Sequence, residues 1–219
     1  MKVFVAGATG RVAGELIKDL VAAGHDVIAG ARRPEAVTLP DDAAAREHIL
    51  PVHLDLHDDA EKLSQTLQNA QAVYFVAGSR GKDLLQTDAF GAVKLMQAAQ
   101  TAGAQRFVML SSLYSLQPEE WGREQMQPLL NYTIAKFFAD NYLTTNTTLD
   151  YTILQPSNLT EEAGTGTIAT GEAGGATNAI PDVAATLAKL LDHPNTIGTV
   201  IRMGAGSTPI DAALSHVRA

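Results

Sequence analysis

Tyr132 and Lys136 lie four residues apart in a stretch that follows Pro128, and this spacing places both side chains on one face of a helix. A lysine ammonium beside a phenol favours the phenolate and lowers the pKa of the tyrosine. A tyrosine in that state can give a proton to a carbonyl or take one from a hydroxyl. Ser111 and Ser112 end an earlier apolar run and offer a hydroxyl for the same oxygen. The simpler alternative is a half-buried tyrosine beside a surface lysine, because such pairs occur on many helices by chance.

A glycine-rich turn, GATGRVAG at 7–14, stands between a short apolar run and an apolar-periodic segment. This order predicts a strand, a tight turn and a helix whose free N–H groups point into the turn. Such a turn binds the pyrophosphate of a dinucleotide, and we expect contacts from Gly7, Thr9, Gly10, Arg11 and Val12. An ordinary strand-to-helix connection can also hold glycine, but the repeating strand–helix pattern that follows favours a nucleotide site.

Arg32 and Arg33 stand where the second predicted strand ends, and no acidic residue accompanies them there. An acid at this place binds the 2′-hydroxyl of NAD, whereas arginine neutralises the 2′-phosphate of NADP. A guanidinium matches the geometry of a phosphate, so the pair predicts NADP rather than NAD. We expect Arg11 to reach the same phosphate. The alternative is that these arginines are solvated surface residues.

Two further pairs follow the next predicted strands. Asp55 and Leu56 come after the third, where a carboxylate can accept the adenine amino group or can simply cap a helix. Ala77 and Gly78 come after the fourth, where small residues let the ribose of a cofactor lie against backbone. Ligands in parallel sheets bind beyond the carboxyl ends of the strands, so all these residues are predicted to share one edge.

Strand and helix patterns alternate along the chain and predict the elements that position these residues. Apolar runs predict strands at 3–6, 27–31, 52–54, 72–77, 107–110, 151–154 and 199–203. Apolar periodicity predicts helices at 10–23, 88–102, 128–145, 181–191 and 209–217, a helix that reaches residue 67, and a short helix near 42–48. Strands regularly followed by helices predict an α/β fold with a Rossmann-type, doubly wound parallel sheet in three αβα layers.

We expect one domain over residues 1–219, with a small C-terminal region on the substrate side. Two segments, about 112–127 and 157–181, are predicted to face the substrate. The stretch 157–179 is rich in glycine and threonine and predicts at most one short strand, at 166–170. Gln155 and Pro156 are predicted to end the strand before it, and Pro128 to open the helix that carries Tyr132.

Composition narrows the class of protein. The net charge of −8 and the absence of long basic runs argue against a nucleic-acid surface. The chain has no cysteine, and its apolar runs are too short to span a bilayer, so we expect a cytoplasmic protein without membrane contact. The six histidines are scattered, and no metal site is predicted. A small-molecule substrate and a monomer or homodimer are expected.

Taken together, these residues resemble the short-chain dehydrogenase/reductase superfamily in its atypical or extended branch, with flavin- and biliverdin-reductase-like relatives. The resemblance covers nearly the whole chain and is carried by the following segments: 7–14, Arg32, Asp55-Leu56, 76–78, the RFVMLSS run, Tyr132 to Lys136, and LDYTILQPSNLT at 149–160. It departs from the family pattern at Ala13, where a glycine is usual, at Gln155, where arginine is common, and at Pro181.

The resemblance implies roles for individual residues. Ser112, Tyr132 and Lys136 would form the catalytic set, and Lys136 would also hold the nicotinamide ribose. Pro156 would lie beside the nicotinamide, and Asn158, with its neighbours Ser157 and Leu159, would belong to a loop that covers the cofactor.

The function predicted from all these features is that of an NADP-dependent oxidoreductase acting on a small carbonyl, quinone or flavin-like substrate. The alternative is an NADP-binding redox sensor or regulator without robust catalysis. Because little chain follows the strand at 151–154, we do not expect the large substrate lobe that sugar-nucleotide chemistry requires.

Overall fold

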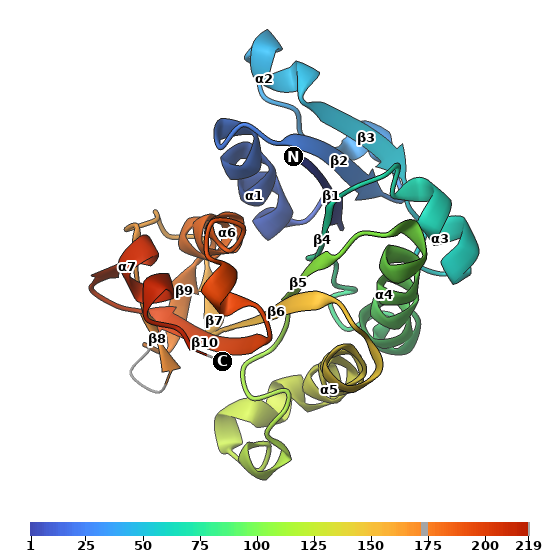
Figure 1. Cartoon of the computed structure of the whole chain (residues 1–219). Coiled ribbons are helices and arrows are strands. Elements are labelled where there is room, and N and C mark those ends of the chain that lie inside the picture. The colour runs from blue at the N-terminus through green and yellow to red at the C-terminus, as the bar shows by residue number, and fades with distance from the viewer. Residues whose placement is uncertain (172–174, 219) are drawn as a thin grey trace.

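The computed structural model describes residues 1–171 and 175–218 and shows a three-layer α/β fold (Figure 1). Helices cover both faces of a central, mostly parallel sheet, as the sequence predicts. The strands are β1 (Lys2–Ala6), β2 (Asp26–Ala31), β3 (Ile49–His53), β4 (Ala72–Phe75), β5 (Arg106–Leu110), β6 (Asp150–Pro156), β7 (Asn158–Thr160), β8 (Thr167–Thr170), β9 (Thr177–Ala179), β10 (Thr199–Ala205) and β11 (Thr208–Pro209). The helices are α1 (Arg11–Ala22), α2 (Ala43–Glu47), α3 (Ala60–Thr66), α4 (Phe90–Ala102), α5 (Leu130–Asn146), α6 (Ile180–Lys189) and α7 (Ile210–Ser215).

The described residues form a nine-stranded main sheet in the order β11-β8-β10-β6-β5-β4-β1-β2-β3. The pairings from β3 to β10 are parallel, whereas β8 and β11 at the other edge are antiparallel. Strand β4 is buried along its whole length, as a central parallel strand should be. Because parallel strands end at the same edge, the residues that follow β1, β2, β4, β5 and β6 meet along one edge of the sheet.

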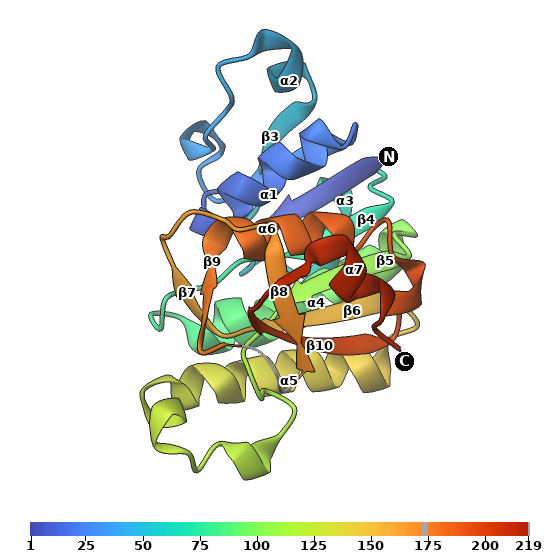
Figure 2. The same ribbon diagram turned by 90° about the vertical axis from the view of Figure 1, so that its left-hand side faces the viewer.

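Helices α1, α6 and α7 pack on one face of the sheet, and α3, α4 and α5 pack on the other (Figure 2). The periodic apolar side chains of α1 from Val12 to Leu20 are buried against the sheet, which confirms the predicted amphipathic helix. Gly24, just beyond α1, has a φ of +82°, the left-handed conformation expected of a residue that ends a helix. No helix within the described ranges is long and apolar enough to cross a membrane.

The segment 157–179 differs from its prediction, because it contains three short strands, β7, β8 and β9, instead of at most one. Strand β7 pairs with β9 in a separate two-stranded sheet, and β8 joins the main sheet through β10. Strands of three or four residues are too short to show alternation, and their partners lie far away in sequence. Residues 172–174 of this segment lie outside the described part of the chain.

A buried carboxylate on α6 holds the loop that precedes β8. Asp182, in the first turn of α6, accepts hydrogen bonds from the backbone N–H groups of Thr165 and Gly166 at 2.9 and 2.8 Å. Asp182 is only 6% exposed, so its removal would leave those two N–H groups without their acceptor. One acidic side chain therefore joins α6 to the loop before β8.

Several element boundaries also differ from the prediction. Pro128 lies inside a 3₁₀ helix, Glu124–Leu129, so it does not open α5, which begins at Leu130. Strand β6 continues through Pro156 because it pairs with β10 up to that residue. Strand β4 ends two residues before the predicted end, β3 begins three residues earlier, and a π-helical turn, Leu84–Ala89, precedes α4. These ends are set by packing between elements rather than by the local sequence.

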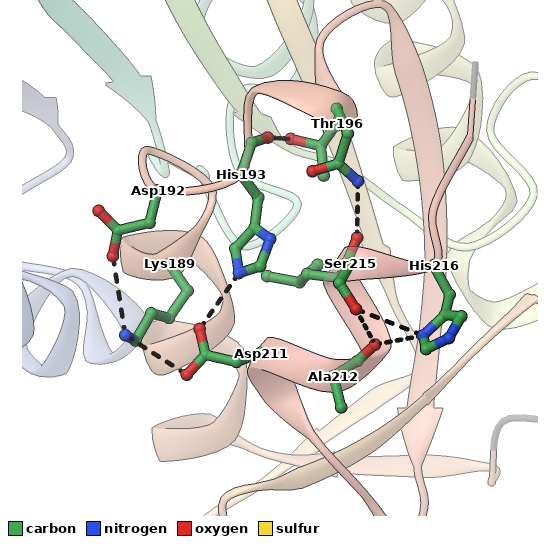
Figure 3. A network of polar contacts seen from close by, with 10 residues as sticks. Lys189, Asp192, His193, Thr196, Asp211, Ala212, Ser215 and His216 are labelled. Carbon is green, nitrogen blue, oxygen red and sulfur yellow. Dashed lines mark hydrogen bonds and ion pairs between the residues drawn. The ribbon is translucent and has the colours of Figure 1, made fainter.

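Polar contacts join the C-terminal helix α7 to the end of α6 (Figure 3). The Asp211 carboxylate contacts Nε2 of His193 at 3.1 Å and Nζ of Lys189 at 3.4 Å, and Lys189 also approaches Asp192 at 3.7 Å. The hydrogen bond with His193 holds the pKa of Asp211 below its usual range. Because Asp211 is largely exposed, these contacts orient α7 more than they stabilise the fold.

The turn between β1 and α1 is held at close range by its neighbours. Gly7 has a φ of +91°, and the N–H groups of Gly7 and Ala8 both donate to the carbonyl oxygen of Gly30 at 3.0 Å. A Cβ added to Gly7 would lie 2.6 Å from Cα of Ala77. Glycine is therefore needed here both for its backbone conformation and for the close approach of β4.

We expect Gly7→Ala to destabilise the protein far more than Gly24→Ala. Both glycines have positive φ, but a Cβ on Gly24 would meet no atom within 4 Å. Gly24→Ala should therefore lower the free energy of unfolding by about 1–2 kcal/mol, the penalty for a left-handed alanine. Gly7→Ala adds overlap with backbone, which contributes about 1–3 kcal/mol more. Urea unfolding of the two variants measures the difference, and equal losses would contradict the assigned packing.

Candidate functional site

A cavity of about 700 Å³ opens at the carboxyl edge of the sheet, beyond β1, β2 and β4. It brings together most residues that the sequence predicts for a dinucleotide. These are Gly7, Thr9, Gly10, Arg32, Arg33, Asp55, Leu56, Ala77 and Gly78. These residues lie in four separate loops between Gly7 and Gly78, and the fold brings the four loops together around one cavity.

The N-terminus of α1 supplies free backbone donors to this region. Gly10 precedes the helix, no side chain caps it, and its first turn carries no acidic residue. The first N–H groups of a helix have no intrahelical partner, so an uncapped end attracts an anion. The Val12 side chain is buried in the core, and any ligand contact from this residue would come from its backbone. These features fit the pyrophosphate of a dinucleotide.

Cationic side chains stand on both sides of the 700 Å³ cavity. Arg32 and Arg33 line it at the end of β2, as predicted. Arg80 and Lys82 line it from the loop after β4, and sequence reasoning missed both. The available signal was their position, just after Ala77 and Gly78 at a strand end. Asp55 and Asp83 line the same cavity, so the four cations leave an excess of positive charge there, which favours an anionic ligand in a protein of net charge −8.

Asp55 does not cap a helix, and its contact with the adenine amino group stays a prediction. Its Oδ1 accepts a hydrogen bond from the N–H of His57 at 3.0 Å, so it organises the turn before α3. It also lines the 700 Å³ cavity. The cap of α3 itself is Asp59, whose Oδ1 accepts from the N–H of Lys62 at 2.8 Å.

Arg11 is paired with an acid in the structure. Its guanidinium contacts the carboxylate of Glu161, which follows β7, and both side chains are more than half exposed. The residues that line the 700 Å³ cavity do not include Arg11. The predicted contact between Arg11 and the 2′-phosphate would therefore have to compete with this ion pair.

A second cavity, of about 440 Å³, lies beyond β5 and β6. Ser112, Tyr132, Pro156 and Asn158 line it, so the predicted catalytic and nicotinamide-side residues are gathered there. Sequence reasoning did not identify three of its other lining residues: Tyr114, Arg123 and Met126. Tyr114 has a φ of +59°, and its ring lies 5.1 Å from the Arg123 guanidinium. Positive φ at a tyrosine is rare and marks a loop held in a fixed shape.

The pKa of the Tyr132 phenol is shifted in the direction opposite to the prediction. Burial raises its pKa, and the charges of Asp88 and Asp140 raise it further. The expectation that Lys136 lowers this pKa is therefore wrong for this structure. The Lys136 ammonium lies 5.8 Å from the centre of the Tyr132 ring, too far to outweigh burial. Tyr132 holds its proton at neutral pH.

Ser112 is buried beside Tyr132 but contacts another residue. Its Oγ lies 3.4 Å from Oγ1 of Thr133, and both Ser112 and Tyr132 face the 440 Å³ cavity. Ser112 and the phenol therefore line the same cavity, as predicted, without a hydrogen bond between them. Thr133 supplies a contact that the sequence did not suggest.

Lys136 is almost fully buried, and neither cavity is lined by it. Its Nζ donates a hydrogen bond to the carbonyl oxygen of Leu110 at 2.9 Å and lies 4.9 Å from the centre of the Phe75 ring. Burial lowers the pKa of Lys136, and the charges of Asp140 and Asp88 oppose that shift. Its predicted contact with the nicotinamide ribose stays a prediction.

The chain belongs to the NAD(P)H-binding family, whose pattern matches residues 7–194. It is 34% identical over 224 residues to a Bacillus subtilis protein, YhfK, named as an uncharacterised sugar epimerase, and the match covers 99% of this chain and all of that protein. Membership agrees with the resemblance carried by the glycine turn and by the segment from Tyr132 to Lys136.

Solved structures show the same fold. The oxidoreductase ylbE of Lactococcus lactis is 44% identical, with a TM-score of 0.93 over 99% of this chain and 96% of that one. A short-chain dehydrogenase/reductase of Veillonella parvula, solved in complex with NADP, has a TM-score of 0.78 at 18% identity over 94% of this chain and 95% of that one. The second likeness shows the fold alone, and together they confirm the predicted Rossmann-type architecture.

We expect Glu161→Gln to tighten NADPH binding, because it frees Arg11 and removes a carboxylate near an anion site. Surface ion pairs are worth about 0.2–1 kcal/mol, so the Kd should fall roughly 1.4- to 5-fold at low salt. Glu162→Gln is the matched control, since it removes the same charge next door without touching Arg11; the Glu162 carboxylate contacts Thr160. Calorimetric titration measures both, and a similar effect in the two variants would exclude the ion pair as the cause.

Proposed function

We propose that the protein is an NADP-dependent oxidoreductase that transfers a hydride between the nicotinamide and a small carbonyl, quinone or flavin-like substrate. The observation that carries this proposal is the position of the two cavities. The 700 Å³ cavity lies at the end of β4, the 440 Å³ cavity at the end of β5, and these two strands are neighbours in the sheet. A dinucleotide laid along this edge would bring its nicotinamide from the glycine turn towards Tyr132.

The residues of the 700 Å³ cavity fit NADP. The uncapped start of α1 would bind the pyrophosphate through backbone N–H groups. Arg32 and Arg33 would bind the 2′-phosphate, and Asp55 would accept the adenine amino group. Ala77 and Gly78 present backbone with small side chains, against which a ribose can lie. When bound, the nicotinamide supplies or accepts the hydride.

Tyr132 is the proton donor in this proposal. Burial raises its pKa and keeps Oη protonated at neutral pH, so donating that proton to a carbonyl oxygen requires a neighbouring group that stabilises the phenolate. The buried Lys136 ammonium would then stabilise the phenolate that remains. Ser112, on the wall of the same cavity, would orient the carbonyl oxygen.

The 440 Å³ cavity sets limits on the substrate. Apolar side chains such as Leu113, Met126 and Met203 line much of it, and Arg123 adds one cation. A cavity of this size and lining suits a compact, largely apolar molecule with a polar reacting group.

Replacing Arg32 with alanine should weaken NADPH binding much more than NADH binding. Hydrogen bonds to charged groups contribute about 1.5–3 kcal/mol, so the Kd for NADPH should rise roughly 10- to 100-fold. NADH lacks the 2′-phosphate and serves as the internal control. Fluorescence titration of both nucleotides gives the ratio, and Arg33→Ala in parallel shows whether the second guanidinium shares the contact. Equal losses for NADPH and NADH would mean that Arg32 does not read the phosphate.

Replacing Tyr132 with phenylalanine should leave NADPH binding intact and reduce kcat by roughly 100-fold or more, the usual contribution of a general acid. Tyr142→Phe is the matched control on the same helix, because the Tyr142 hydroxyl contacts Gln97 and not the cavity. NADPH oxidation with a panel of carbonyl compounds, quinones and flavins measures turnover. Unchanged turnover in Tyr132→Phe would remove the phenol from the mechanism. Binding of NADPH without oxidation by any acceptor would favour the sensor alternative.

A further inference from the structure

Asp140 is a fully buried carboxylate that the reaction outlined above does not use. It lies on α5, and its Oδ2 accepts hydrogen bonds from the hydroxyls of Ser111 and, at 2.5 Å, Ser115. The Ser115 oxygen in turn accepts a hydrogen bond from Nε2 of Gln155 at 2.8 Å. Asp140 thus joins α5 to the end of β5, to the loop that follows it and to β6.

The second oxygen of Asp140 has no such partner. Oδ1 is buried and makes no hydrogen bond to any described residue. Burying a carboxylate oxygen without a donor is costly, so a structural bridge alone would be better served by a neutral side chain. Burial raises the pKa of Asp140 to about 6, while the hydrogen bonds from Ser111 and Ser115 and the charge of Lys136 act in the opposite direction. The group therefore ionises close to neutral pH.

Asp140 follows Lys136 by four residues, just as Lys136 follows Tyr132, so the three side chains share one face of α5. The negative charge of Asp140 raises the pKa of both Tyr132 and Lys136. Asp88, in the π-helical turn before α4, acts in the same direction on both groups. From β5, the loop and β6, the groups that contact Asp140 are the uncharged Ser111, Ser115 and Gln155, named above.

Ser111 connects this buried cluster to the substrate side. It lines the 440 Å³ cavity, precedes Ser112 directly, and donates its hydroxyl hydrogen to Asp140. The Asp140 carboxylate therefore holds the chain just beyond β5, next to Ser112, which lines the same cavity as Tyr132.

We propose that Asp140 is a positioning residue of this site: its carboxylate holds the chain at the end of β5 through Ser111 and Ser115, on the same face of α5 as Lys136 and Tyr132. This inference rests on the proposed oxidoreductase function. Protonation of Asp140 in acid weakens the hydrogen bonds from Ser111 and Ser115, so activity falls on the acid side as Asp140 takes up its proton. In alkali, the carboxylate delays the loss of the protons on Lys136 and Tyr132.

Two variants separate this role from a structural one, with kcat measured from acid to alkaline pH. Asp140→Asn should lower kcat roughly tenfold or more, because it loosens the site. It should also abolish the acid limb of the pH profile, in which kcat falls as the pH is lowered. It should also move the alkaline limb to lower pH, because Lys136 and Tyr132 both lose a neighbouring negative charge. Ser115→Ala keeps the charge but removes a hydrogen bond that favours the carboxylate. It should move the acid limb to higher pH and leave the alkaline limb in place.

Asp182→Asn is the matched control, since it also removes a buried carboxylate that holds a loop, but this carboxylate does not contact Tyr132 or Lys136. It should lower the melting temperature without moving either limb. Carboxyl-carbon NMR of Asp140 gives its ionisation directly, and agreement of its midpoint with the acid limb supports the assignment. Limbs that stay unmoved in both Asp140→Asn and Ser115→Ala would overturn the inference, and Ser115→Ala alone decides if Asp140→Asn fails to fold. If the wild-type protein fails to oxidise NADPH with every acceptor in the panel, the proposed function is overturned, and the inference falls with it.

Discussion

The close packing of the β1–α1 turn against the ends of β2 and β4 is the constraint on which the rest of the site depends. The carbonyl of Gly30 accepts two N–H groups from this turn, and Ala77 lies against Gly7 with no room for a side chain. These contacts hold the ends of three strands together and fix the direction of α1. The uncapped N–H groups of that helix consequently lie at the edge where Arg32 and Arg80 approach from opposite sides. An anion site is built by backbone geometry first and by charged side chains second.

The order of the parallel sheet then determines what can stand next to that anion site. Strand β4 has β1 on one side and β5 on the other, so the glycine turn and the serines that follow β5 are separated by a single strand. The charges divide in the same way. Cations gather around the 700 Å³ cavity, whereas the buried acids Asp88 and Asp140 act on Tyr132 near the 440 Å³ cavity. The 700 Å³ cavity also includes Asp55 and Asp83, but its four cationic side chains outnumber these two acids, which favours an anion there in a protein with an overall excess of acid.

Much of this arrangement could be predicted from the sequence because it depends on local signals. The glycine turn, the arginines after β2 and the small residues after β4 each follow a recognisable strand, and parallel topology brings them together. The short strands β7 and β9 were missed because each has only three residues, too few to show alternation, within a segment rich in glycine and threonine. Arg80 was missed although it follows Ala77 and Gly78 at a strand end, and Tyr114 was not singled out within the segment 112–127, because the local sequence does not fix where a loop side chain points. The pKa of Tyr132 was predicted in the wrong direction because spacing shows which charges are near, but not how deeply they are buried.

Burial also explains why α5 carries a third ionisable group. A lysine and a tyrosine placed together in a buried site would both tend to their neutral forms, because burial disfavours an ammonium and a phenolate alike. Lys136 can support proton transfer at Tyr132 only in its charged form, and a carboxylate on the same helix face opposes the loss of that charge. The carboxylate is held by hydroxyls rather than by a direct ion pair with Lys136, whose Nζ donates to Leu110 instead. The charge of Asp140 thus opposes the lowering of the Lys136 pKa by burial while Nζ stays 5.8 Å from the centre of the Tyr132 ring.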